Sequence, residues 1–258
     1  MSTTSEFCQL GMLNGLGQSN FDGDDSTPKD RPGRFAYVVD AFGTRIFQYG
    51  RNCKGSAITM GECLIRLADI AVSNITSGTT LSAVKASAWT ADKSVGELLY
   101  VEDNDDSAGA APEGEVGVIG SNSSGVANLD PQYPLTVALA ANDDLDTISP
   151  GWHFDTSGAA AKAQECRGIA CGKDGITSLN YGWTQVYGIV PVAQLKASTG
   201  FTDRAAIITG VSKIDVDANG GWELVIGHSL GTVTSDIVSD KAMCFINVYS
   251  PTLNAGTP

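Results

Sequence analysis

The chain has 258 residues, of which 17% are charged and 30 are glycine. Sixteen Lys and Arg against 29 Asp and Glu give a net charge of −13, which excludes the clustered basic surface that a nucleic-acid binder needs to displace counterions from phosphates. Apolar runs are far shorter than the ~18–20 residues that cross a bilayer, so neither nucleic acid nor a membrane is an expected partner.

Surface helices need Glu, Lys and Arg, which are scarce here, whereas Gly, Ser, Thr and Val are abundant. The composition therefore predicts an all-β fold of short antiparallel strands in a β-sandwich or barrel, divided into two small β domains after an extended N-terminal arm. Residues 1–6 lack the basic and apolar regions of a secretory signal, and we expect the protein to stay in the compartment where it is translated.

Residues 1–34 form the predicted arm. A weak apolar series is interleaved with glycines and followed by the acidic stretch 22–33, which cannot build a core of its own. The arm is therefore either a disordered terminus or an extension over a partner surface, and its apolar residues favour the second. The candidate contact residues are Phe7, Leu10, Met12, Leu13, Leu16 and Phe21.

The first β domain is predicted over residues 35–114. Residues 35–40 and 44–49 are short β-rich runs on either side of a glycine turn. Residues 56–70 fit a helix or a strand equally well, because short apolar runs do not settle the period. The acidic residues 102–106, followed by Pro112, predict a linker or long exposed loop that ends this domain.

The second β domain is predicted over residues 115–258, with strands at regular spacing between Gly, Asn, Asp and Pro. Asn219-Gly220 further predicts a tight hairpin turn within residues 213–226. The predicted strands are Val116–Ile119, Leu135–Ala140, Gly168–Cys171, Gln185–Val192, Ala206–Thr209, Lys213–Val216, Trp222–Ile226 and Cys244–Tyr249.

Two motifs resemble functional sites. Residues 227–231 read Gly-His-Ser-Leu-Gly, the G-x-S-x-G nucleophile elbow of hydrolases, but a β-branched segment follows and no histidine lies after Ser229. A glycine-flanked turn between strands is the preferred interpretation. Residues 215–220 match half of a calcium loop, but Ile226 stands where the bidentate Glu is needed. We predict a plain β-turn there, with adventitious calcium as the alternative, and we expect no catalytic residue, metal or cofactor.

The six cysteines lie at positions 8, 53, 63, 166, 171 and 244. In a chain of this size, without a secretory signal, they are expected to be reduced, buried thiols that pack as small hydrophobes. Cys166 and Cys171 form a C-x4-C pair, but no second pair or nearby histidine completes a zinc site.

Several stretches share short motifs with one class of structural protein. The similar motifs are "G-x-R-x-x-Y" and "l-x-x-G-e/d" in an opening hairpin, "a-R-G-I-A" and "G-x-x-G-W-v-q-v-x-G" in central strands, and a closing pair, "i-G-x-a-l" and "a-x-v-x-v". They lie in residues 42–49 with 53–62, 166–170, 181–188, and 226–230 with 242–248. In these residues the chain resembles the capsid decoration (cement, or auxiliary head) proteins of tailed bacteriophages, over about residues 36–66 and 164–250.

The resemblance implies a non-enzymatic virion protein, made in the host cytoplasm, that binds the outer surface of a capsid. There it would bridge subunits of the major capsid protein, often as a trimer, and the arm would clamp a neighbour. The alternative is a carbohydrate- or cell-surface-binding β module of a head fibre or tail. In that case tryptophans would line one exposed face to stack on sugars, and the candidates are Trp89, Trp152, Trp183 and Trp222.

Overall fold

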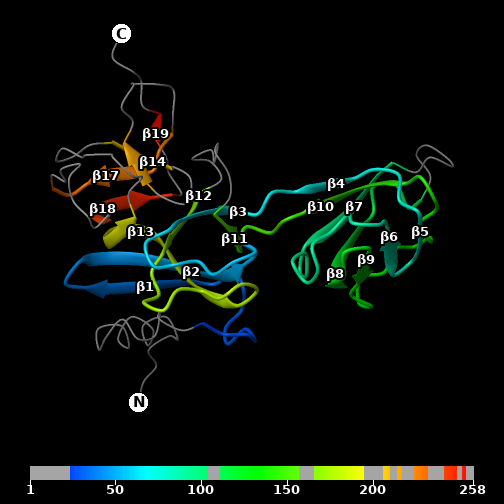
Figure 1. Ribbon diagram of the computed structural model, residues 1–258, viewed down its shortest axis with the longest axis horizontal. Coiled ribbons are helices and arrows are strands. Elements are labelled where there is room, and N and C mark those ends of the chain that lie inside the picture. The colour runs from blue at the N-terminus through cyan, green and yellow to red at the C-terminus, as the bar shows by residue number, and fades with distance from the viewer. Residues whose placement is uncertain are drawn as a thin grey trace, which may run out of the picture. The chain divides into compact units, whose positions relative to one another are not determined.

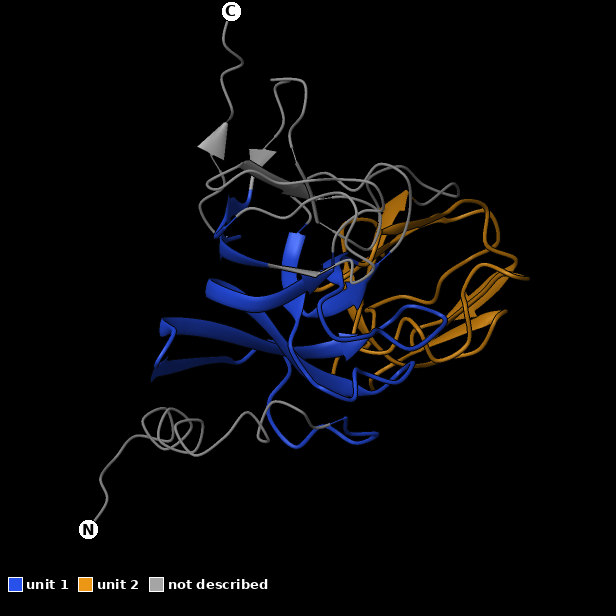
Figure 2. Cartoon of the chain, turned by 60° about the vertical axis from the view of Figure 1, so that its left-hand side comes forward, with its two compact units in different colours: residues 1–66, 151–258 blue, residues 67–150 orange. Residues whose placement is uncertain are grey.

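The computed structural model describes residues 24–103, 111–156, 166–194, 206–209, 214–216, 224–231, 241–248 and 252–253. Throughout these residues the structure is all-β, as predicted, and contains no helix. The chain divides into two compact units, which Figure 2 colours separately. Unit 1 comprises residues 1–66 and 151–258, and unit 2 comprises residues 67–150.

Unit 1 is built on one sheet, and part of it closes on itself. β2 pairs with β11, β11 with β3, β3 with β12, β12 with β13, and β13 again with β2, so five strands form a small barrel. β1 extends the sheet beyond β2, and β18, β17, β14 and β15 extend it beyond β13 (Figure 1). The strands are β1 (Phe35–Asp40), β2 (Gly43–Asn52), β3 (Cys63–Arg66), β11 (His153–Asp155), β12 (Cys166–Ala170), β13 (Tyr181–Gln194), β14 (Ala206–Thr209), β15 (Ile214–Val216), β17 (Gly227–Ser229) and β18 (Lys241–Asn247).

Two apolar clusters lie on opposite sides of β2. One fills the barrel and contains Ile58, Leu64, Phe154, Ala170 and Ile176. Gly50 is required at this point of β2, because a Cβ there would lie 2.3 Å from the Phe154 ring. The other cluster lies outside the barrel under β1, whose side chains alternate between buried and exposed in the way expected of a half-covered strand. Its buried members are Ala36, Val38, Phe47, Tyr49, Cys171 and Trp183.

Unit 2 is a seven-stranded antiparallel sheet in the order β4-β10-β7-β8-β9-β6-β5. Its core is mainly aliphatic and is formed by residues such as Leu99, Val101, Ile119 and Leu145, together with Trp89. The strands are β4 (Ile70–Val72), β5 (Ser77–Thr79), β6 (Ser82–Val84), β7 (Leu98–Asp103), β8 (Val116–Asn122), β9 (Val126–Leu129) and β10 (Asp144–Ile148).

The predicted domain boundary at residue 114 differs from the structure. β7 and β8 on either side of it are hydrogen-bonded neighbours within unit 2. The acidic stretch therefore belongs to a connection between two paired strands, and composition alone does not distinguish that from a linker. Unit 2 is instead inserted into unit 1 between β3 and β11, where Arg66 and Phe154 lie opposite each other in an antiparallel pair.

Two predictions of local structure are wrong. Residues 135–140 form no strand. Among the described residues of 213–226, the predicted pairing is not found: β15 pairs with β14, and β16 (Leu224–Val225) pairs with β19 (Thr252–Leu253). Both strands of that hairpin exist, so the error lies in which strands they pair with.

The described end of the arm is anchored on unit 1. Asp25 forms a β-bridge with Tyr181. The neighbouring Asp24 carboxylate accepts hydrogen bonds from the hydroxyl and, at 2.9 Å, the backbone N–H of Thr177. The six predicted contact residues, from Phe7 to Phe21, lie outside the described residues.

Candidate docking surfaces

One side of the unit 1 sheet carries a row of apolar side chains across four neighbouring strands, β1, β2, β13 and β18. The row ends at Leu230, just after β17, whose own residue on this side is the exposed His228. Residues directly opposite each other in a sheet share a face. The register pairs Tyr37 with Ile46, Ile46 with Tyr187, and Ile189 with Phe245. We call this surface the open face and define it by Tyr37, Val39, Ile46, Tyr187, Ile189, Phe245, Met243 and Leu230.

The open face is accessible to solvent. Val39 is 73% exposed and Met243 41% exposed, while Ile46 and Ile189 are half-buried. The rings of Tyr187 and Phe245 meet edge to face with centroids 5.3 Å apart, which fixes the middle of the surface. An apolar sheet face of this extent normally packs against another layer or a partner protein.

The open face exists because β2 and β13 extend beyond the end of the barrel. Within the barrel, Gln48 on β2 lies opposite Thr184 on β13, and both are buried. Two residues earlier on β2, Ile46 points to the same side but lies where the barrel has ended. The side of each strand that lines the barrel interior therefore continues as a solvent-accessible apolar face.

Unit 2 has a smaller apolar patch on the outer side of its sheet. Leu98 is 39% exposed and Val116 49% exposed, and the register places Leu98 opposite Val118 and Tyr100 opposite Val116. Carboxylates share this surface, since Asp146 lies opposite Tyr100 on β10. The patch is therefore both narrower and more acidic in its surroundings than the open face.

A pocket of about 430 Å³ lies on the other side of the unit 1 sheet, near the turn between β1 and β2. Arg45 contributes its guanidinium, which is ion-paired with Asp40 and stacked against the rings of Phe42 and Phe47. The Arg45 charge is therefore already satisfied within the hairpin. The remaining lining is Met60, Ala170, Cys171, Lys173, Gln185, Val190, Pro191 and Val192.

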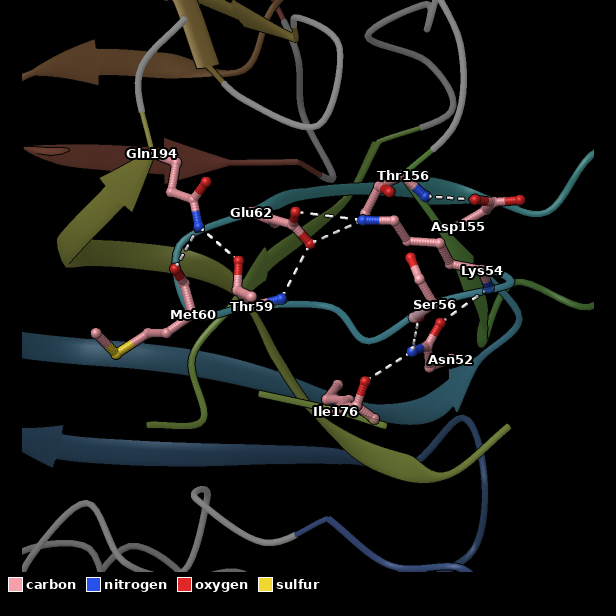
Figure 3. A network of polar contacts seen from close by, with 10 residues as sticks. All are labelled: Asn52, Lys54, Ser56, Thr59, Met60, Glu62, Asp155, Thr156, Ile176 and Gln194. Carbon is pink, nitrogen blue, oxygen red and sulfur yellow. Dashed lines mark hydrogen bonds and ion pairs between the residues drawn. The ribbon is translucent and has the colours of Figure 1, made fainter. Parts of the chain in front are cut away.

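The loop between β2 and β3 is fixed by a network of polar contacts, drawn in Figure 3. The Lys54 ammonium lies 3.3 Å from both carboxylate oxygens of Glu62, and one of these oxygens also accepts the backbone N–H of Thr59 at 3.0 Å. The Gln194 amide donates to the Thr59 hydroxyl and to the carbonyl of Met60. These contacts hold the loop against the end of β13, and their role is therefore structural.

The same network is anchored at its other end by Asn52. Its amide donates to the carbonyl of Ser56 at 3.0 Å and to that of Ile176 at 2.7 Å, and its oxygen accepts the backbone N–H of Lys54 (Figure 3). Asn52 is fully buried, so these bonds satisfy a polar group that is costly to leave unpaired.

Many residues of the sequence motifs lie at positions in unit 1 where close packing of the strands requires them. Gly168 and Gly188 both have positive φ angles, and a Cβ at either would lie within 2.5 Å of a backbone oxygen on a neighbouring strand. Trp183 packs against Tyr49, with ring centroids 5.0 Å apart. These motifs therefore describe close strand packing in the sheet.

The hydrolase-like motif does not adopt the geometry of a nucleophile elbow. Ser229 lies in β17, paired with Cys244 on β18, and is 1% exposed. An elbow needs the serine at the tip of a sharp strand-to-helix turn, with its hydroxyl accessible. The predicted glycine-flanked turn is also wrong for residues 227–229, which form a strand.

The remaining candidate sites give no functional cluster within the described residues. Asp215 lies in β15, while positions 217–223 of the calcium-like stretch fall outside the described residues. In the part of the chain that the structure describes, no group of three or more His, Cys, Asp and Glu is placed to hold a metal. Helices long and apolar enough to cross a membrane are likewise absent from that part.

The described cysteines are free and buried, which confirms the prediction for positions 53, 63, 166, 171 and 244. Two of them lie close together: the Sγ atoms of Cys63 and Cys166 are 3.9 Å apart. Position 8 lies outside the described residues.

Comparison of the chain with protein-family models, with curated proteins and with solved structures found no match. Sequence reasoning placed the contact residues in the arm and did not identify the open face. The available signal was β1 itself, where Phe35, Tyr37 and Val39 are apolar on the side that should be polar if it faced only water.

Proposed function

We propose that the protein is a non-enzymatic structural component of a tailed-phage virion, which binds the outer surface of the capsid through unit 1. The observation that carries this proposal is the open face, an apolar sheet surface that is exposed on β1 and at Met243 of β18 and half-buried on β2 and β13 between them. In the proposed role it packs against the major capsid protein, and the arm residues Phe7 to Phe21 add apolar contacts to a neighbouring capsid subunit or a second copy.

The distribution of charge supports unit 1 as the attachment unit. Unit 2 contains 13 acidic residues and 2 Lys or Arg, a net charge of −11 out of the chain's −13. Unit 1 contains 16 acidic and 14 basic residues, a net charge of −2. Association of like-charged surfaces costs free energy, so a nearly neutral unit with an apolar face suits a stable contact, while a strongly acidic one suits exposure to solvent.

The anchorage of residues 24–25 also supports the proposed role of the arm. Asp24 and Asp25 are held at Thr177 and Tyr181, so the preceding residues start from a fixed point on unit 1. An extended chain advances about 3.3 Å per residue, and in the proposed role the residues before Asp24 extend from this point to a neighbouring subunit.

The carbohydrate-binding alternative has less support. Trp89 and Trp183 are buried, and Trp152 is half-buried against the ring of His153. Trp222 lies outside the described residues. The described tryptophans thus do not form the exposed row that a sugar-stacking surface requires.

The first test is purification of particles from the source culture on a density gradient, with protein quantification across the fractions. Co-migration with DNA-filled heads at high copy number would support the proposal. A few copies per particle would indicate a fibre or tail protein and overturn the capsid role, and absence from particles would overturn the virion assignment altogether.

The second test uses purified protein and heads that lack it. The Val39→Asp substitution places a charge in the open face, and we expect it to weaken head binding at least about tenfold, because burying an unpaired carboxylate is costly. Val116→Asp on the outer surface of unit 2 is the matched control and should bind like the wild type. The reverse result would assign attachment to unit 2.

A further inference from the structure

The buried thiols of Cys63 and Cys166 form a pair between two neighbouring strands of unit 1. Their Sγ atoms are 3.9 Å apart, and each residue is 2% exposed. Cys166 lies opposite Ile65 on β3, two residues from Cys63, so both side chains point to the same side of the sheet. A disulfide needs the two sulfurs about 2 Å apart, so they must approach each other by roughly another 2 Å.

The position of this pair in the chain gives it a consequence for the whole fold. Cys63 begins β3, whose last residue Arg66 directly precedes unit 2. Cys166 begins β12, the first strand of unit 1 after β11 has paired with β3. A bond between the two sulfurs would close a covalent ring that contains all of unit 2.

We propose that Cys63 and Cys166 are an oxidative modification site, at which a peroxide joins the two thiols in a disulfide. This bond would close a covalent loop that contains unit 2.

The two thiols are not equivalent, and the difference assigns their roles. The pKa of Cys166 is lowered, mainly by the hydrogen bond with Cys63 and against the opposing effect of burial, with further lowering by the backbone N–H of Gly168 and the charge of Arg167. The pKa of Cys63 is raised well above its usual value by its hydrogen bond with Cys166 and by burial. Cys166 is therefore the thiol of the pair that loses its proton more readily, and the thiolate is the form that reacts with peroxide.

The chemistry balances with hydrogen peroxide as the oxidant. The Cys166 thiolate attacks one peroxide oxygen, an S–O bond forms, the O–O bond breaks, and the departing hydroxide takes up a proton to become water. The Cys63 thiol then attacks the sulfenic sulfur, an S–S bond forms, the S–O bond breaks, and the hydroxyl leaves with the Cys63 proton as water. Two thiols and one peroxide yield one disulfide and two waters.

Cys244 is the competing partner, since it is close enough for its charge to raise the pKa of Cys63. Burial raises the pKa of Cys244 itself to about 12, which keeps it protonated and unreactive near neutral pH. The pKa of Cys63 is raised as well, so the feature that favours the pair Cys63–Cys166 is the contact between their Sγ atoms at 3.9 Å. This chemistry is independent of any binding partner of the protein.

The test uses the full chain, purified under reducing conditions and then exposed without denaturant to stoichiometric hydrogen peroxide. Remaining thiols are alkylated and the protein is mapped by mass spectrometry. We expect a cross-linked peptide pair containing Cys63 and Cys166, which is lost in Cys63→Ser and in Cys166→Ser but retained in the control Cys53→Ser. Recovery of free thiols at both positions, over-oxidation of Cys166 alone, or a bond to Cys244 would each overturn the proposal.

A second measurement protects the result against misfolded variants. The oxidised wild-type chain should unfold at a temperature on the order of 5–10 °C above the reduced chain, because the bond closes a long loop. Reduction should reverse the shift. An oxidised chain that carries the bond but unfolds at or below the reduced midpoint would show that the folded sheet does not accommodate the bond, which would also overturn the proposal.

Discussion

The two units of this protein are both all-β, yet they differ in charge and in the make-up of their cores. Unit 2 carries a net charge of −11 and unit 1 a net charge of −2. The core of unit 2 is mainly aliphatic, whereas unit 1 packs Phe47, Tyr49, Trp183 and Phe154. Among the described residues, unit 1 also carries the apolar row of the open face.

Under the proposed function, this contrast assigns attachment to unit 1 and most of the repulsive charge to unit 2. An acidic surface repels other acidic surfaces and keeps a protein dispersed at high concentration, and residues 67–150 supply most of that charge. The remainder of the chain is close to neutral, which lets an apolar sheet face form a contact without a large electrostatic cost.

Removal of unit 2 is the change with the largest expected effect. Arg66 and Phe154 are register partners in the β3–β11 pair, so a short Gly- and Asn-containing turn can join the two strands directly. We expect the shortened chain to keep the β-rich circular dichroism spectrum of unit 1 and to lose most of its retention on an anion exchanger, as its net charge falls to about −2.

The control for this deletion keeps residues 67–150 and changes only the residues where unit 2 joins unit 1. Loss of unit 1 structure in the shortened chain, with the control folded, would contradict the separation of the two units.

Glycine substitutions give the next largest expected effect, because the loss in unfolding free energy should differ between the two units. A Cβ at Gly188 in unit 1 would lie 2.5 Å from the backbone oxygen of Thr44, at a φ of +95. Gly188→Ala should therefore lower the free energy of unfolding by about 4 kcal/mol or more, from backbone strain and steric overlap together. In unit 2, Gly117→Ala meets only the side chain of Leu129, which can move, and should cost about 1–2 kcal/mol.

Urea unfolding followed by circular dichroism measures both changes. Gly55→Ala, with nothing within 4 Å of the new Cβ, is the neutral control. Equal losses for Gly188→Ala and Gly117→Ala would show that the close approach of β13 to β2 is less demanding than the structure indicates.

The sequence predicted local structure better than long-range pairing. Residues 35–40 and 116–119 form strands as expected, because alternation and β-branched residues are local signals. The inserted position of unit 2 was missed, because it depends on the pairing of Arg66 with Phe154, which are distant in the chain. Composition marked residues 101–114 as a break, and nothing local shows that β7 and β8 pair across it.

The candidate surface was predicted even less well, for a physical reason. Docking surfaces are made where strands from different parts of the chain lie side by side, as Ile46, Tyr187 and Phe245 do. Each of these residues is unremarkable in its own segment. The arm residues were selected because a segment without a core of its own shows its apolar residues directly, and they still await a test.

Truncation of a core side chain in unit 2 has the third largest expected effect on stability. Leu99 is fully buried in its core, and Leu99→Ala should cost about 3 kcal/mol from lost apolar burial and the cavity left behind. Leu98, the preceding residue on β7, faces outward, and Leu98→Ala should cost less than about 1 kcal/mol.

The fluorescence of Trp89, whose indole N–H donates to the Thr147 hydroxyl in the unit 2 core, reports this unit. The near-ultraviolet dichroism of Trp183 and Tyr49 reports unit 1. If Leu99→Ala shifts both signals by the same amount, the two units unfold as one cooperative body and the comparison between them does not extend to stability.

The smallest expected effect concerns Tyr49, in the aromatic cluster of unit 1. Its hydroxyl accepts the backbone N–H of Lys29 at 3.2 Å and lies 3.4 Å from an oxygen of Asp25, so it ties the described end of the arm to β2. Burial, with the nearby Asp25 charge, raises the pKa of Tyr49 to about 12 from the ordinary value of 10.0. Tyr49→Phe should cost about 1 kcal/mol at neutral pH, because one hydrogen-bonding group is lost.

The raised pKa also predicts a dependence on alkaline pH. Below pH 10 both the folded and the unfolded chain keep the Tyr49 proton, and its contribution to stability is complete. Between about pH 10 and 12 the unfolded chain releases the proton while the folded chain retains it, so the free energy of unfolding falls as the pH rises. The difference in unfolding free energy between wild type and Tyr49→Phe should therefore shrink over this interval in urea titrations. A difference that stays constant to pH 12 would show that Tyr49 ionises as freely in the folded protein as in the unfolded chain, and that the arm is held by other contacts.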